Sequence, residues 1–170
     1  HGYINEWGMT QFLADARIAP IYEGTNGIQA MDLIGRKLPS KNGEVIRECF
    51  SMIQNFIDHN KENDEISHYA ELLEKALQRQ QAATMWLMKN AMDDPDQAGA
   101  TAYYYLNPMA LVSMGYFWAD MVLKAKSMLS SGEGNKEFRT VKSQMLISFF
   151  TIYCRKPLCF VIRLRLVPKT

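Results

Sequence analysis

The stretch VIRECFSMIQNFI, residues 45–57, repeats apolar side chains every three or four positions. That spacing matches the 3.6-residue period of an α-helix, so the stretch predicts an amphipathic helix with one apolar face. A single helix cannot bury such a face alone, and other helices must therefore cover it. The apolar positions are Val45, Ile46, Cys49, Phe50, Ile53, Phe56 and Ile57.

Two further helical patterns follow this stretch. After a polar break at residues 58–64, a second apolar stripe runs from Tyr69 to Leu87. A third helix is predicted from about Gln97 to Ser130, preceded by acidic residues that suit the positive end of a helix dipole. No internal repeat and no convincing strand alternation occur before Phe149. The sequence therefore predicts an all-α fold, an antiparallel helical bundle from about residue 43 onward, with the methionine and aromatic residues between 103 and 121 in its core.

The first forty residues predict two shorter helices. One covers Met9–Arg17 and ends before Pro20, since proline disfavours helix in the residue before it. Residues 21–27 are expected to form a loop. A second helix is expected over Ile28–Leu38, capped by Thr25 or Asn26. The run PSKNG, residues 39–43, is rich in turn-forming residues and is predicted to be a linker.

Composition excludes several classes of protein. The chain has 170 residues, 48% of them hydrophobic, which is typical of a globular domain rather than a disordered chain. A net charge of +1 gives no reason to expect a nucleic-acid or membrane partner, and no apolar run is long enough for a membrane span. Three cysteines without a CxxC pair favour a reducing compartment.

The loop IYEGTNG, residues 21–27, carries the candidate chemistry. Gly24 lacks a Cβ and lets another group approach the backbone beside Glu23. The apolar pair before Glu23 would raise the pKa of its carboxyl by desolvation, whereas the helix start after it would lower that pKa. These residues alone leave two alternatives: a positioned acid–base group, or a solvated loop glutamate before an ordinary capped helix.

The longer stretch GYINEWGMTQFLADARIAPIYEGTNGIQAMDLIGRKL, residues 2–38, resembles the end of the acyl-CoA dehydrogenases. The IYEGT element and the Ile28-Gln29 pair that follows carry the resemblance. The continuation resembles a subgroup with an appended C-terminal helical domain, which includes 3-methylmercaptopropionyl-CoA dehydrogenases. This resemblance is specific over residues 1–38 and looser over residues 39–140. It implies a flavoenzyme that forms the α,β-double bond of an acyl-CoA thioester.

The resemblance also implies roles for individual residues. Glu23 would be the base that removes the α-proton, and Gly24 would line the thioester. The cofactor FAD would take the hydride and would be contacted by Thr25, Asn26, Gly27 and Gln29. Expected partners are an acyl-CoA substrate, an electron acceptor such as electron-transfer flavoprotein, and further copies of the chain in a homo-oligomer. The expected location is the bacterial cytoplasm.

Two departures from the family pattern limit what the chain can do alone. Ala14 stands where the family usually has an arginine. The glycines that normally precede the HGY element, and the domains that supply most flavin and CoA contacts, are missing from the sequence. We therefore expect this chain alone to be inactive. The alternative hypothesis is a free-standing, non-catalytic helical interaction module, and the upstream DNA would distinguish the two.

The domain organisation is predicted in three parts. Residues 1–38 are the end of the catalytic C-terminal domain, residues 39–141 the appended helical bundle, and residues 142–170 an out-of-frame tail. The last twenty residues carry five bases and no acid. Back-translation of residues 142–170 into the neighbouring frame permits the string ISNANFFFYYLLPKTSLLCHKIKAGAEN, which resembles the end of the same subgroup. A frameshift near residues 139–142 is the corresponding hypothesis.

Overall fold

The structure, a computed structural model, describes residues 4–21, 25–64, 66–90, 93–132 and 144. All regular elements in this part of the chain are helices, so the predicted all-α class is confirmed. The five α-helices are α1 (Thr10–Arg17), α2 (Thr25–Asp32), α3 (Glu44–Asn60), α4 (Ser67–Asn90) and α5 (Pro95–Ser130). Among these described helices, none is both long and apolar enough to cross a membrane.

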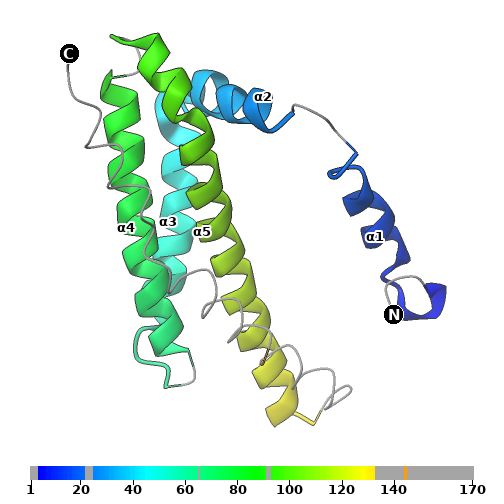
Figure 1. The fold of residues 1–170 in the computed structure, drawn as a ribbon. Coiled ribbons are helices and arrows are strands. Elements are labelled where there is room, and N and C mark those ends of the chain that lie inside the picture. Colours follow the sequence, from blue (N-terminus) through cyan, green and yellow to red (C-terminus); the bar gives the residue numbers. More distant parts are fainter. Residues whose placement is uncertain (1–3, 22–24, 65, 91–92, 133–143, 145–170) are drawn as a thin grey trace.

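Helices α3, α4 and α5 form an antiparallel bundle, as predicted (Figure 1). Helix α4 packs against both α3 and α5, and the rings of Phe56 and Tyr116 meet edge to face with centroids 5.2 Å apart. The core residues come mostly from the predicted stripes, and full burial of each large apolar side chain contributes about 1.5–3 kcal/mol. Among the most buried are Ile53, Ile57, Leu73, Leu77, Leu87, Tyr105 and Val112.

The start of α5 has an explicit cap. The carboxylate Oδ1 of Asp94 accepts a hydrogen bond of 2.9 Å from the backbone N–H of Gln97. Pro95 then occupies the first helical position, where its missing N–H costs no hydrogen bond. The helix continues through Pro108 without interruption to Ser130.

The connection between α2 and α3 differs from the predicted linker. Helix α2 passes into a π-helical segment, η2 (Leu33–Lys37), where the Leu38 N–H bonds to the Leu33 carbonyl at 2.8 Å. A 3₁₀ turn, η3 (Ser40–Gly43), then leads the chain into α3. Lys41 and Asn42 adopt left-handed backbone angles there, as does Gly43 at the start of α3. The five linker residues thus form one tight corner.

Two expectations are wrong in detail. The loop predicted through Gly27 ends earlier, because α2 already begins at Thr25. Of the residues expected in the core between 103 and 121, Tyr105 and Val112 are buried, but Tyr103, Met114 and Phe117 are exposed. Apolar residues occur on all sides of α5, but α2, α3 and α4 cover only part of its surface.

Candidate functional site

The predicted cofactor residues lie together on the first turns of α2. Thr25 is the first helical residue and is half-buried, while Asn26, Gly27 and Gln29 are exposed. Thr25 and Gln29 are four residues apart and therefore share one face of the helix. The first backbone N–H groups of α2 have no partner within the helix and are suited to binding an anionic group. Glu23 and Gly24 lie outside the described residues.

Space around this helix start is open. A Cβ placed on Gly27 would meet no other atom within 4 Å. A flat cofactor could therefore approach the backbone here without a clash inside this chain. Exposed amides at Asn26 and Gln29 offer donors and acceptors next to that opening. These residues fit the FAD contacts that the family resemblance implies.

Large apolar side chains on α1, before α2 and on α2 itself are exposed. Phe12 on α1 is 66% exposed, Ile21 61% and Ile28 67%. Helix α1 buries none of its residues. An isolated domain seldom leaves so many large apolar side chains in water, so these residues have the character of interface residues.

The far end of α2 carries a charge cluster. Asp32 accepts hydrogen bonds from Arg36 at 2.6 and 2.9 Å, and Lys37 Nζ lies 3.4 Å from the same carboxylate. The Arg36 guanidinium beside Asp32 lowers the pKa of that carboxyl, and Asp32 raises the pKa of Arg36 in turn. Because the cluster is solvent-exposed, its ion pairs hold the side chains at the end of α2 together but contribute little to the free energy of unfolding.

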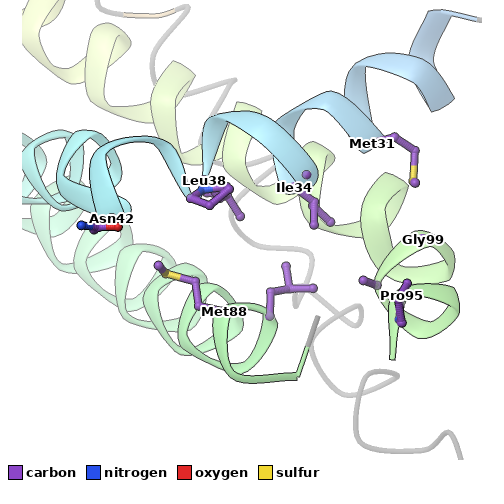
Figure 2. A pocket seen from close by; sticks show the side chains of 11 residues that line it. Met31, Ile34, Leu38, Asn42, Met88, Pro95 and Gly99 are labelled. Atoms are coloured by element: carbon purple, nitrogen blue, oxygen red, sulfur yellow. The ribbon is translucent and has the colours of Figure 1, made fainter. Parts of the chain in front are cut away.

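Below α2 lies a cavity of about 620 Å³. Figure 2 shows that Met31 of α2, Ile34 of η2 and Leu38 directly after η2 reach it, opposite Met88 of α4 and Pro95 of α5. Asn42 provides an amide at its edge, and no residue of the lining is titratable. The cavity can therefore hold apolar groups but cannot supply acid–base chemistry. The complete lining is Met31, Ile34, Gly35, Leu38, Pro39, Asn42, Leu87, Met88, Pro95, Ala98 and Gly99.

Other candidate groups do not form a site. Cys49 is half-buried on α3 beside the core, and burial raises the pKa of its thiol, which favours an unreactive neutral form. His59 and His68 are exposed. The described part of the chain contains no group of three or more His, Cys, Asp or Glu side chains arranged to hold a metal ion.

Comparison with protein families identifies the class. Residues 49–153 match the family described as acetyl-CoA dehydrogenase C-terminal like. The chain therefore belongs to this family, the C-terminal domain family of acyl-CoA dehydrogenases, as the resemblance at the N-terminal motif implied.

The curated relatives agree with this assignment. The chain is 34% identical to a 3-methylmercaptopropionyl-CoA dehydrogenase from Ruegeria pomeroyi, over 83% of this chain and 24% of the relative. It is 26% identical to the broad-specificity linear acyl-CoA dehydrogenase FadE5 from Mycobacterium tuberculosis, over 88% of this chain and 25% of the relative. The chain thus spans about a quarter of the length of these relatives.

Proposed function

We propose that this chain is the C-terminal part of an FAD-dependent acyl-CoA dehydrogenase that forms the α,β-double bond of an acyl-CoA thioester. One observation carries the proposal: the IYEGT element leads directly into α2, whose first turns present Asn26, Gly27 and Gln29 to open space. The relatives named as acyl-CoA dehydrogenases support it. Bound FAD would accept the hydride from the β-carbon.

In this proposal Glu23 is the general base. The α-proton of a thioester is weakly acidic, so a carboxylate must be held close to it and partly shielded from water. Ile21 and Tyr22 precede Glu23 in the sequence and would shield it in the complete protein. Gly24 leaves room for the thioester beside the backbone, where an N–H can stabilise the developing charge on the thioester oxygen.

The first turns of α2 would hold the cofactor. Thr25 and Gln29 share a helix face, and Asn26 and Gly27 lie next to it. Their hydroxyl and amide groups would bind the polar parts of FAD, with the free N–H groups of the helix start directed at its negative charge. Electrons would leave to an acceptor such as electron-transfer flavoprotein, and the complete enzyme would be a homo-oligomer.

The test is a Glu23→Gln variant of the complete protein. Glutamine keeps the shape of the side chain but cannot take up the α-proton. We expect FAD to remain bound while an acyl-CoA no longer bleaches the flavin in stopped-flow absorbance. Glu6→Gln is the matched control, because Glu6 is an exposed carboxylate on the preceding 3₁₀ helix η1 (Asn5–Trp7) and its variant should react normally. Near-normal bleaching by Glu23→Gln would exclude Glu23 as the base.

A further inference from the structure

The cavity below α2 has a buried wall and a more open side. Leu38 after η2, Leu87 of α4 and Ala98 of α5 form the buried wall, and each of these residues is at most 8% exposed. Met31 is 52% exposed and Met88 43%, so these two side chains lie toward the opening. The volume of about 620 Å³ falls within the range of small-molecule sites, about 300–1,000 Å³. The space is therefore large enough for a small ligand.

The cavity is elongated. Figure 2 shows Asn42, Leu38, Ile34 and Met31 following one another along one side of it, opposite Met88 of α4. The seven positions between Met31 and Leu38 correspond to roughly 10 Å at about 1.5 Å per helical residue. An extended alkyl chain fits such a shape better than a compact ring does.

Two flexible methionine side chains border this space. Met31 Sδ and Cε lie 3.7 Å from the Cβ position of Gly99, and Met88 Cε lies 2.7 Å from that of Gly43. Each thioether thus lies against a residue that has no side chain. Methionine has three rotatable bonds and adapts to irregular apolar spaces, so the opening can adjust to a ligand without movement of the helices.

The lining determines the chemistry of the ligand. None of the described residues that line the cavity is charged, and the polar side chain among them is that of Asn42. Burial of an unpaired charge against such a wall would be unfavourable, whereas burial of an alkyl chain is favourable. The exposed Asn42 amide can pair with a neutral hydroxyl or amide group at one end of the ligand.

The backbone beside the cavity departs from regular helix in two places. The π-helical segment η2 supplies Ile34 and Gly35, and the left-handed corner supplies Asn42. The carbonyl of Asn42 accepts a hydrogen bond of 3.0 Å from Arg47 Nη1, which holds this corner. π-helical turns and left-handed non-glycine residues cluster at functional sites and ligand clamps. We propose that the cavity binds a neutral, straight-chain alkyl compound of medium length, with its polar end at Asn42.

This site is separate from the proposed cofactor residues. Thr25 and Gln29 share one face of α2, and Met31 lies roughly 200° around the helix from Gln29 at about 100° per residue. The cavity therefore lies on the other side of α2. Binding there requires neither FAD nor an acyl-CoA, so its test can fail or succeed independently of the role proposed for Glu23.

Methionine methyl NMR of the 170-residue chain, titrated with n-octanol, tests the proposal. The methyl signals of Met31 and Met88, assigned with Met31→Leu and Met88→Leu, should shift and saturate at one ligand per chain. The signal of Met85 should not shift, because Met85 lies outside the lining and is 73% exposed on α4. Cyclooctanol, a ring alcohol with the same number of carbon atoms, should bind at least about tenfold more weakly.

A substitution that fills the cavity provides a second measurement. Gly99→Leu adds a side chain next to Met31, where its Cβ makes an ordinary contact, and leucine favours helix more than glycine does. The affinity for n-octanol should fall at least about tenfold, because the added side chain occupies the same space. Ala100→Leu is the matched control, since Ala100 is the next residue of α5, is exposed and lies outside the lining.

Several results would overturn the proposal. These are the absence of saturable shifts at Met31 and Met88, equal shifts at Met85, and equal affinity for cyclooctanol. Unchanged affinity in Gly99→Leu, with its fold verified by circular dichroism, would place the ligand elsewhere and would also overturn it. The methyl shifts of the parent chain decide the question even if Gly99→Leu does not fold.

Discussion

The hydroxyl groups of Thr84 and Tyr105 lie 2.7 Å apart in the buried core between α4 and α5. Thr84 Oγ1 donates its proton to the Gln80 carbonyl at 2.8 Å. A threonine hydroxyl has only one proton, so the Tyr105 hydroxyl must be the donor to Thr84. Both residues are almost fully buried, and neither hydroxyl can readily exchange its partner for water.

Replacing the tyrosine should therefore destabilise the bundle. Tyr105→Phe removes the donor and leaves a buried acceptor at Thr84, with an expected loss of about 1–2 kcal/mol in the free energy of unfolding. Tyr103→Phe is the control, because Tyr103 is exposed and its variant should be close to neutral. Urea denaturation near neutral pH measures both variants. Equal stability of Tyr105→Phe and the parent would show that the hydrogen bond contributes nothing.

The same tyrosine predicts a loss of stability in alkali. Burial raises the pKa of Tyr105 above its ordinary value of 10.0, with a smaller opposing effect of the hydrogen bond to Thr84. Above pH 10 the unfolded chain thus releases the phenolic proton while the folded chain retains it. The free energy of unfolding must then fall as the pH rises further.

Thermal unfolding in a Cys49→Ala background isolates this effect, since burial also raises the pKa of the Cys49 thiol. The fall in melting temperature above pH 10 should be smaller after Tyr105→Phe. An unchanged alkaline profile would assign the loss to other groups.

Gly43 at the corner before α3 should not tolerate a side chain. Its φ is +76°, and a Cβ there would lie 2.7 Å from Met88 Cε. Because methionine is flexible, most of the cost comes from the backbone, and Gly43→Ala should lose about 1–2 kcal/mol. Gly35→Ala is the matched control, since a Cβ at Gly35 meets no atom within 4 Å. Equal unfolding midpoints for the two variants would contradict this account of the corner.

Restoring the neighbouring reading frame near residues 139–142 should raise stability. The restored string places three consecutive phenylalanines and two tyrosines in the stretch where the printed frame has Phe149 and Ile152. Each large apolar side chain that becomes fully buried contributes about 1.5–3 kcal/mol, less the cost of ordering the helix. The restored chain should melt at a higher temperature and aggregate less. Resequencing that confirms the printed frame, with equal stability of both chains, would reject the frameshift.

Helical periodicity was sufficient to predict the bundle. Ile53 and Leu77 stand on regular apolar stripes, and both are buried where the pattern places them. Periodicity did not predict the π-helix at Leu33–Lys37, because a shift from i−4 to i−5 hydrogen bonding depends on how this segment packs against α5. It also placed Phe117 in the core, since apolar character alone does not reveal which side of a helix has a neighbour.

Reasoning from the sequence predicted only part of the candidate site. The motif around Glu23 indicated a family and its chemistry, and Thr25 was correctly expected near a helix start. That Asn26 and Gln29 are exposed depends on which face α2 turns toward α5, and this follows from tertiary packing rather than from local sequence.

The packing of α2 on α5 links the proposed catalytic segment to the bundle. Ala30 of α2 is fully buried, and Met31 lies against Gly99, 3.7 Å from the position of a Cβ there. The corner at Gly43 joins the same segment directly to α3. A thermal fluctuation that separates the bundle helices therefore also removes the support of α2. The half-life of the proposed enzyme on heating would then be governed by how fast this C-terminal bundle opens.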